Sequence, residues 1–457
     1  MSPSSETSDG LPESDIAASL ERLAALPDWL RAALNADVVA GALRRNVPEF
    51  ASGALTLRGC KIKRMLLKGH DGRWSGTYNL TIEEAGEKRP VALRGTLTAP
   101  RLRPAYDGDQ LAPAAFGAAD WRCVLPDLGL ELEPEPPDSE LAAMPQLTDP
   151  EEARTLIERG IRERAAYADM RIAACTPEVL SYKPGSRCVI RYHLEYPPEL
   201  AERDWPTTVI AKTYRKDSKA KNAFEGMLAI WNSPLAGGDV VSIAEPLAYV
   251  SELKLMVQAP IAEELTLEDL LKSALREGTP ESLDELYGCM RKAAAGLAAF
   301  HLSGAHHGES LALEYRFPEI RELIDRLVVA EPEVGDAATP LLARLEAYAA
   351  VHPAGALVPT HGTFNPEQVL IHQGRIGFID FDDFCMAEPA LDVGLFCSAI
   401  RDTGMGDLDD ADREARLARL AQLDAICEVF IAEYTAHAPL SRERVTLWQA
   451  LDFLRNC

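Results

Sequence analysis

The spacing of apolar residues changes near the middle of this 457-residue chain. Apolar and polar residues alternate in five segments before residue 260, a pattern typical of β-strands: 60–82, 90–98, 178–196, 207–214 and 240–258. Beyond residue 260 apolar residues recur every three or four positions, as in helices, apart from two short apolar runs at 368–371 and 376–380. A β-rich half followed by a mostly helical half predicts an α+β fold with two lobes.

Composition along the chain predicts five segments. Residues 1–15 are rich in Ser, Glu, Asp and Pro, which predicts a disordered tail. An accessory module of helices and a β-hairpin is expected over 16–124, and the acidic, proline-rich stretch 125–152 is predicted to be a linker. The rest divides into a β-rich N-lobe, 153–260, and a helical C-lobe, 261–457.

A weak internal repeat links the accessory module to the N-lobe. Residues 66–82 followed by 91–94 are similar to residues 180–196 followed by 209–212, if a small insertion is allowed. The similarity fits a duplicated half-lobe. It equally fits chance similarity between two hairpins of ordinary β composition, and both interpretations stay open.

Charge and cysteine content exclude several classes of partner. The formal net charge is −24, so the chain has no surplus of Lys and Arg to neutralise nucleic acid or an anionic membrane. No run of about 18 uncharged apolar residues occurs, which excludes a spanning helix, and the first residues do not form a signal peptide. Nine scattered cysteines without Cys-x-x-Cys spacing predict reduced thiols in a cytoplasmic protein.

The most informative residues lie between 360 and 383. Phosphoryl transfer in kinase-like folds uses a loop residue near the acceptor hydroxyl, an amide side chain as metal ligand, and an Asp that binds Mg²⁺. Thr363 is followed five positions later by Gln368, and Asp380 lies twelve positions further on, at the end of an apolar strand. The spacing therefore matches a phosphoryl-transfer site.

These residues carry a resemblance to a known family. His361-Gly-Thr363 with Gln368, and Ile379-Asp-Phe-Asp382, resemble the His-Gly-Asp-(four residues)-Asn loop and Ile-Asp-x-Asp strand of the aminoglycoside phosphotransferase and choline kinase superfamily, with an atypical His-Gly-Thr loop. The resemblance covers about 170–400. It implies a bilobal protein-kinase-like fold and an enzyme that uses ATP and Mg²⁺ to phosphorylate a hydroxyl of a small-molecule acceptor.

The resemblance also implies a set of nucleotide-binding residues. Lys212 would meet the nucleotide phosphates, with Glu225 of the following helix as its partner, and Gln258 would lie in the hinge between the lobes. The turn between two predicted strands would cover the phosphates, through Gly185 and Ser186, with Lys183 and Arg187 beside them.

The remaining implied residues concern the metal and the acceptor. Gln368 and Asp380 would hold Mg²⁺, His361 would brace the loop, and Thr363 and Asp382 would face the acceptor hydroxyl. Asp392 is predicted to brace the loop or cap a helix rather than to bind a ligand.

Thr363 stands where the family carries its catalytic Asp. A hydroxyl does not accept a proton at neutral pH as a carboxylate does, and general-base assistance contributes roughly 10²–10⁴ in rate. Two alternatives follow. Either the chain is an enzyme in which catalysis is slow or the base is Asp382 or Asp383, or it is a pseudokinase-like nucleotide-binding or scaffolding protein that transfers no phosphate.

Overall fold

A computed structural model describes residues 13–24, 27–68, 70–104, 115–135, 139–406, 408 and 413–456. The chain divides into two compact units. Unit 1 comprises Met1–Pro137, Arg316–Tyr348 and Leu454–Cys457, and unit 2 comprises Asp138–Tyr315 and Ala349–Phe453. Most of the predicted tail, residues 1–12, lies outside the described residues. The described part starts within the first helix, α1 (Glu13–Ala24), so residues 13–15 are helical rather than disordered.

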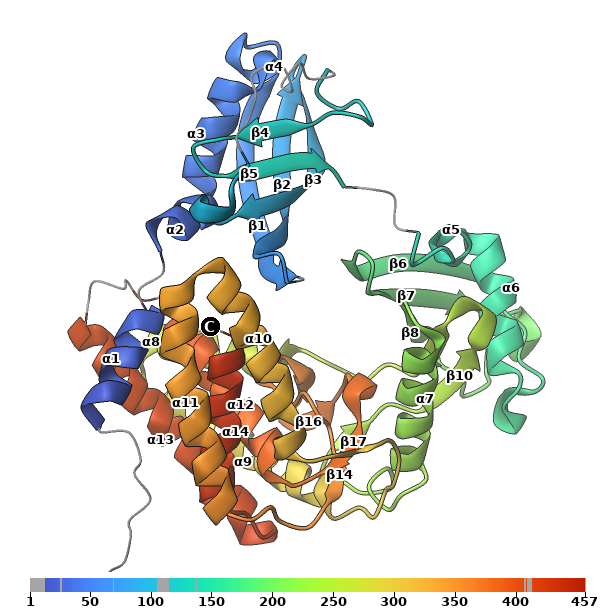
Figure 1. Cartoon of the computed structure of the whole chain (residues 1–457). Helices are drawn as coiled ribbons and strands as arrows, with labels where there is room; N and C mark the ends of the chain where they lie inside the picture. Colours follow the sequence, from blue (N-terminus) through green and yellow to red (C-terminus); the bar gives the residue numbers. More distant parts are fainter. Residues whose placement is uncertain are drawn as a thin grey trace, which may run out of the picture. The chain divides into compact units, whose positions relative to one another are not determined.

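Unit 1 is built on a five-stranded antiparallel sheet with the strand order β1-β2-β3-β5-β4 (Figure 1). Its strands are β1 (Thr56–Lys68), β2 (Arg73–Glu84), β3 (Glu87–Thr98), β4 (Cys123–Leu125) and β5 (Leu130–Pro134). Three further helices precede the sheet: α2 (Asp28–Leu34), α3 (Ala36–Asn46) and α4 (Pro48–Ala51). The Asn35 side chain caps α3 by accepting from two backbone N–H groups. Val39 and Leu43 of α3 are fully buried in the core shared with the sheet.

The predicted linker 125–152 is wrong over its first part. Leu130 and Leu132 point into the core, and the acidic residues between them point outward, so β5 is a half-buried strand. It pairs with both β3 and β4. The acidic, proline-rich composition obscured an alternating pattern that the sheet uses.

The predicted C-lobe is wrong over 316–348, because this stretch belongs to unit 1. It forms α10 (Arg316–Ala330) and most of α11 (Pro332–Val351). Ala330, at the turn between them, is fully buried in the core of unit 1. The next residue, Glu331, accepts a hydrogen bond of 3.1 Å from the indole of Trp29. These contacts join residues about 300 positions apart, which local spacing does not reveal.

Unit 2 begins with a second five-stranded antiparallel sheet, in the order β6-β7-β8-β11-β10. Its strands are β6 (Ala174–Lys183), β7 (Arg187–Glu195), β8 (Thr208–Tyr214), β10 (Pro246–Val250) and β11 (Leu255–Gln258). Helices α5 (Met144–Thr148) and α6 (Pro150–Ile161) precede it, and α7 (Asp217–Trp231) follows β8 (Figure 1). Ile157 and Ile161 of α6 are buried in the core of this sheet.

The remainder of unit 2 is mostly helical. Its helices are α8 (Leu267–Glu277), α9 (Pro280–His301), α12 (Ala390–Met405), α13 (Arg413–His437) and α14 (Arg442–Asn456), the last ending in unit 1. Two small sheets lie among them. One contains β12 (Leu265–Thr266), β15 (Val369–His372), β16 (Arg375–Phe378) and β9 (Ser242–Ile243); the other contains β13 (Ser310–Leu311), β17 (Cys385–Ala387) and β14 (Val358–Thr360). A β-rich part followed by a helical part confirms the predicted α+β, kinase-like fold.

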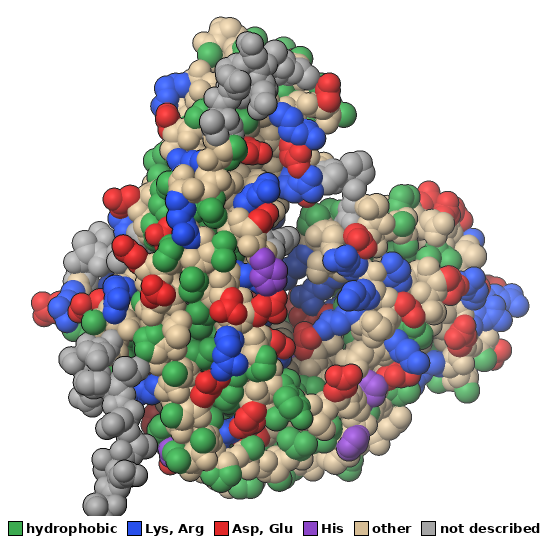
Figure 2. Space-filling view, viewed as in Figure 1, with side chains coloured by type: hydrophobic (Ala, Val, Ile, Leu, Met, Phe, Trp, Pro, Cys, Tyr) green, Lys and Arg blue, Asp and Glu red, His purple; other side chains and the backbone are tan. Residues whose placement is uncertain are grey.

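The surface charge, the helices and the cysteines can each be compared with what the sequence predicted. Figure 2 shows Asp and Glu side chains spread over the drawn face among Lys and Arg, so the acidic surplus is not confined there to one patch. None of the described helices is long and apolar enough to cross a membrane. Within the same residues the cysteines form no disulfide.

Candidate active site

A cavity of about 480 Å³ lies between the first sheet of unit 2 and the β15–β16 hairpin. This volume is in the range of small-molecule sites. Apolar side chains form much of its wall: Leu180, Val189, Ile210, Pro260, Ile261, Leu370 and Ile379. One end is charged, with Arg187, Lys212 and Asp380 in its lining.

The charged end contains a compact group of five side chains, called here the cavity cluster: Arg187, Lys212, Tyr214, Asp380 and Asp382. Lys212 Nζ lies 2.5 Å from Asp380 Oδ1 and 3.1 Å from Asp382 Oδ1. The Arg187 guanidinium contacts the same two carboxylates at 3.1 Å and 2.8 Å. Lys212 is only 6% exposed, so the sheet presents a buried cation rather than a solvated lysine.

Strand geometry explains why the basic residues converge. In the β7–β8 pairing Arg187 lies opposite Tyr214, and Val189 opposite Lys212. Side chains two positions apart on a strand point to the same face, so Lys212 and Tyr214 share the face that carries Arg187. The Tyr214 hydroxyl donates to Asp382 Oδ1 at 2.8 Å. Tyr214 was not among the residues predicted from the sequence, although its position two residues after Lys212 places it on the same strand face.

The charges of the cavity cluster stabilise one another. Burial alone would lower the pKa of Lys212, but the charges of Asp382 and Asp380 outweigh burial and raise it. Burial alone would raise the pKa of Asp380, but the charges of Lys212 and Arg187 hold it well below its ordinary value. Burial, followed by the charge of Asp382, raises the pKa of Tyr214 well above its ordinary value. At neutral pH Lys212 is therefore charged, Asp380 is ionised, and Tyr214 keeps its proton.

The predicted pairing of Glu225 with Lys212 is wrong. Helix α7 buries Ala223, Gly226 and Met227, and Glu225 points to the opposite, exposed side. Its carboxylate lies 3.8 Å from Lys221, one turn earlier on the same helix. The sequence correctly predicted the helix but not which face it turns to the sheet.

Asp392 holds the loop that contains His361. Its two carboxylate oxygens accept hydrogen bonds from the backbone N–H of His361 at 2.6 Å and of Gly362 at 2.8 Å. The buried ring of His301 lies 3.0 Å from the same carboxylate. Asp392 is therefore the loop brace that the sequence predicted.

The His361 side chain links the loop to the strand that ends at Asp380. Its Nε2 donates to the backbone oxygen of Ile379 at 2.8 Å, because a carbonyl only accepts. Asp380 follows directly, with φ of 72°, in the left-handed region that Asp enters more readily than most residues. The hydrogen bond from His361 thus supports the bend that turns the Asp380 carboxylate into the cavity.

Asp380 and Gln368 were predicted to hold Mg²⁺, and the structure supports the two unequally. Asp380 fits, because Mg²⁺ is commonly bound by one or two carboxylates with phosphates and waters, and Asp380 lines the cavity. The Gln368 amide oxygen instead accepts from the backbone N–H of Asn365 at 3.1 Å, and its Nε2 lies 3.4 Å from Asp380 Oδ2. Both contacts fix the same amide orientation. It turns the nitrogen, which cannot ligate a metal, toward Asp380.

Asp382 does not occupy its predicted place at the acceptor. Its side chain is 2% exposed and is held by Arg187, Lys212 and Tyr214 within the cavity cluster. The chain after β16 brings it to Lys212 and Tyr214 of β8, at the charged end of the cavity. A buried carboxylate with three partners has no free face for an acceptor hydroxyl.

Of the remaining predicted site residues, Gln258 lines the cavity, whereas Gly185, Ser186 and Thr363 do not. Gln258 ends β11 and lines the cavity, and its buried Oε1 has no hydrogen-bond partner within the described part of the chain. Gly185 and Ser186 form the β6–β7 turn, with φ of 66° at Gly185, but they are not among the cavity-lining residues. Thr363 is half-buried and follows Gly362 in the loop outside the cavity lining.

The model of the phosphotransferase enzyme family matches residues 200–439, more than half of the chain. The chain belongs to this family. The matched stretch of this phosphotransferase contains Lys212, the His361 loop and Asp380, and starts after β7. The resemblance found in the sequence is thereby confirmed at the level of the superfamily.

Solved structures similar to the phosphotransferase share little sequence with it. A choline/ethanolamine kinase family protein from Mesorhizobium loti is 15% identical with a TM-score of 0.42, over 66% of this chain and 82% of that one. The ternary complex of APH(2'')-IIa with streptomycin and ATP is 14% identical with a TM-score of 0.41, over 65% and 92%. A glucosamine kinase bound to glucosamine, ADP and inorganic phosphate is 14% identical with a TM-score of 0.38, over 91% and 93%. No curated protein matches the chain.

Proposed function

We propose that this phosphotransferase uses ATP and Mg²⁺ to phosphorylate a hydroxyl group of a small molecule. The observation that carries the proposal is a pair of cations, the buried Lys212 and the partly buried Arg187, at the charged end of a cavity that also has apolar side chains in its wall. Apolar walls suit a nucleobase, and cations at one end suit its phosphates. The family membership supports the same chemistry.

The cavity cluster has a charge balance that nucleotide binding can preserve. Without nucleotide, Lys212 and Arg187 are neutralised by Asp380 and Asp382. Bound phosphates would pair with the two cations in place of a carboxylate, and Asp380 would then be available to hold Mg²⁺. No buried charge is left unpaired, which matters because an uncompensated buried charge costs about 3–5 kcal/mol.

Mg²⁺ would be held by Asp380 together with nucleotide phosphates and water, and it would neutralise charge that develops on the transferred group. Lys212 and Arg187 position the phosphates, while His361 and Asp392 keep the loop and the Asp380 bend in place. We place this activity in the cytoplasm, the compartment that supplies ATP. The acceptor belongs to the sugars, amino alcohols or aminoglycosides.

The first test is a thermal shift with Mg-ATP on the whole chain, followed by ATP consumption with glucosamine, choline and streptomycin. Wild-type protein is expected to be stabilised by Mg-ATP and to consume ATP with at least one acceptor. Asp380→Ala is expected to lose the Mg²⁺-dependent part of the shift. Asp239→Ala is the matched control, because Asp239 is fully exposed and pairs with the exposed Arg375 at 3.5 Å.

The outcomes separate the alternatives. Absence of any Mg-ATP shift in the wild type would overturn the proposed function. A shift without ATP consumption would support the non-catalytic, pseudokinase-like alternative. An unchanged Mg²⁺ dependence in Asp380→Ala would remove Asp380 from the metal site.

A further inference from the structure

The loop that carries Thr363 lies beside the segment that carries Asp383. Strands β14 and β17 are antiparallel, with Thr360 opposite Cys385. Continued by two residues, this register places Gly362 opposite Asp383. Gly362 and Asp383 lie in close contact. A side-chain carbon on Gly362 would clash with the Asp383 carbonyl oxygen and lie 3.3 Å from Asp383 Cβ.

The carboxylate of Asp383 differs from those of its two neighbours in its partners. Asp380 and Asp382 are bound by Lys212 and Arg187 inside the cavity cluster. Asp383 instead pairs with Lys219 of α7, and 47% of its side chain is exposed. A carboxylate accepts about four hydrogen bonds, so one ion pair leaves Asp383 able to receive a proton from a second group.

Other polar groups of the loop cannot perform this task. The His361 ring is fully buried and its Nε2 donates to Ile379, so an acceptor cannot reach it. Asn365 carries an amide, and its oxygen caps the backbone N–H of Glu367. The Thr363 hydroxyl remains protonated at neutral pH.

We propose that Asp383 is the general base of the phosphotransferase, in place of the carboxylate that position 363 lacks. The inference rests on the proposed function. The acceptor oxygen attacks the γ-phosphorus of the nucleoside triphosphate while its proton passes to an Asp383 carboxylate oxygen. The bond from the γ-phosphorus to the bridging oxygen breaks, and the nucleoside diphosphate leaves with that bond's electron pair.

Lys219 is a positioning residue in this scheme. It lies on α7 and forms its ion pair with Asp383 Oδ1. The pair orients the carboxylate.

The same geometry accounts for threonine at position 363. A carboxylate at position 363 would directly follow Gly362, where an added side-chain carbon would lie 3.3 Å from Asp383 Cβ. Neighbouring carboxylates resist joint ionisation, and one of them is forced to keep a proton. A base at 363 and a base at 383 are therefore alternatives, and this chain has the second.

The test uses four full-length variants: Asp383→Asn, Thr363→Asp, the two combined, and Asp239→Asn as the charge control. Turnover is measured as ATP consumption with glucosamine, choline and streptomycin and as ATP hydrolysis with water alone, and nucleotide binding as the Mg-ATP thermal shift. Asp383→Asn is expected to lower kcat about a hundredfold, the lower end of general-base effects, and to keep Mg-ATP binding. Thr363→Asp alone is expected to gain nothing, but combined with Asp383→Asn it is expected to restore kcat at least about tenfold.

Different results overturn different claims. A wild type that binds no Mg-ATP overturns the proposed function. A wild type that binds Mg-ATP but turns over with neither acceptor nor water overturns the Asp383 base and leaves nucleotide binding standing. Normal kcat in Asp383→Asn, or no rescue by Thr363→Asp, also overturns it. If Asp383→Asn fails to fold, Lys219→Met takes its place, with a several-fold loss of kcat expected and an unchanged kcat counting against the base.

Discussion

The two units contain sheets with the same strand order, yet only one of these sheets carries the proposed site. The order is β1-β2-β3-β5-β4 in unit 1 and β6-β7-β8-β11-β10 in unit 2. Both sheets have a cation on the central strand, Arg94 on β3 and Lys212 on β8, at the positions that the sequence repeat aligns. The shared order is what a duplicated half-lobe requires, and the repeat stays a hypothesis.

The cations differ in what surrounds them. Arg94 is about half exposed and bonds Glu133, which lies directly opposite on β5. Lys212 lies opposite Met256 and finds its carboxylates outside the sheet, at Asp380 and Asp382. In unit 1 the carboxylate that pairs with the cation comes from the same sheet. In unit 2 the carboxylates come from the segment that follows β16, outside the sheet.

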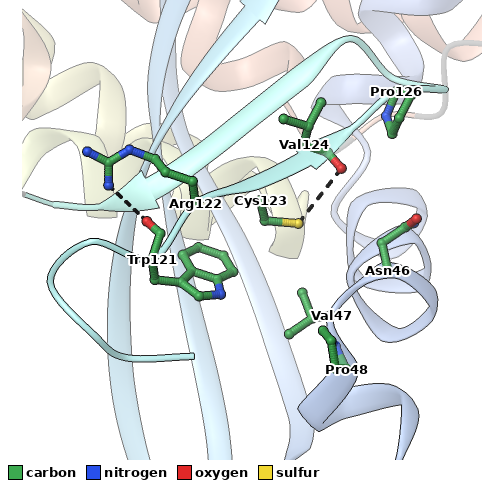
Figure 3. Close-up of a pocket in the computed structure, with 8 residues that line it drawn as sticks. All are labelled: Asn46, Val47, Pro48, Trp121, Arg122, Cys123, Val124 and Pro126. Carbon is green, nitrogen blue, oxygen red and sulfur yellow. Dashed lines mark hydrogen bonds between the residues drawn. The ribbon is translucent and has the colours of Figure 1, made fainter. Parts of the chain in front are cut away.

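The pocket of unit 1 and the cavity of unit 2 also differ in whether their polar side chains already have partners in the same sheet or backbone. The pocket of unit 1 in Figure 3 has a volume of about 90 Å³, between the end of α3 and strand β4. Its polar side chains are bonded to nearby backbone, Asn46 to Ala42 and Arg122 to Trp121. The unit 2 cavity instead ends in charges that an anionic ligand can compete for. A strand order alone therefore does not make a site; a second layer that buries exchangeable charges does.

The largest expected effect comes from removing the cation of each sheet. Lys212→Met is expected to weaken Mg-ATP binding at least about a hundredfold, about 2.7 kcal/mol, because a buried phosphate partner is lost. Arg94→Met is expected to leave it within about twofold. Titration of both variants with Mg-ATP, followed by calorimetry or thermal shift, measures the difference. Equal losses in the two variants would contradict the comparison.

The next effect concerns the carboxylates. Asp382→Asn leaves the buried Lys212 and the partly buried Arg187 facing one carboxylate and is expected to cost about 3 kcal/mol in the free energy of unfolding. Glu133→Gln breaks partly exposed pairs with Arg94 and Arg122 and is expected to cost at most about 1 kcal/mol. Urea unfolding of ligand-free protein measures both. A cost for Asp382→Asn below that for Glu133→Gln would show that burial does not distinguish the two pairs.

The sequence predicted the parts of the site that follow from local pattern. Lys212, His361 and Asp380 were predicted because each stands in a short motif on one strand or loop. Asp382 and Asp383 stayed open as alternative bases, because the β14–β17 register beside Asp383 joins segments that are distant in the sequence. Glu225 was misassigned because amphipathic spacing locates a helix but not its partner.

The same limit explains the errors in the fold. The α10–α11 stretch has helical spacing whichever core it joins, and the burial of Ala330 and the Trp29–Glu331 hydrogen bond show that it joins unit 1. The strand at 130–134 was detectable, because Leu and Glu alternate there. Its prolines and acidic charge favour a linker, but the alternation of Leu and Glu favours a strand, and the structure has the strand.

Buried tyrosines provide a smaller, matched contrast. Tyr214 donates at 2.8 Å to the Asp382 carboxylate, whereas Tyr78 of β2 reaches the Ala33 carbonyl oxygen only at 3.4 Å. Tyr214→Phe is expected to cost about 2 kcal/mol in unfolding free energy, because hydrogen bonds to charged groups contribute roughly 1.5–3 kcal/mol. Tyr78→Phe is expected to cost about 0.5 kcal/mol. Chemical unfolding of the two variants measures both losses of unfolding free energy. A larger loss for Tyr78→Phe than for Tyr214→Phe would contradict the Tyr214–Asp382 hydrogen bond.

The smallest expected effect is on the acid dependence of the unfolding free energy, which compares a carboxylate of the cavity cluster with an exposed one of unit 1. The pKa of Asp380 is held well below its ordinary value by Lys212 and Arg187, against the opposing effect of burial. Below about pH 4 the unfolded chain therefore takes up a proton that folded Asp380 refuses, and the stabilisation is lost as pH falls toward the folded pKa. The difference in unfolding free energy between wild type and Asp380→Asn is expected to be constant from about pH 5 to 8, and to shrink by up to about 1.4 kcal/mol per pH unit below pH 4.

The unit 1 control for this acid dependence is Glu83, whose pKa is lowered chiefly by its hydrogen bond to Arg58 on the exposed face of β1–β2. Glu83→Gln is expected to change the acid dependence less than Asp380→Asn, because water screens the exposed pair. Unfolding curves at intervals from pH 3 to pH 8 measure both slopes. An Asp380→Asn difference that stays flat through pH 3 would mean that Lys212 and Arg187 do not hold this carboxylate ionised. The cavity cluster would then resemble the solvated pairs of unit 1.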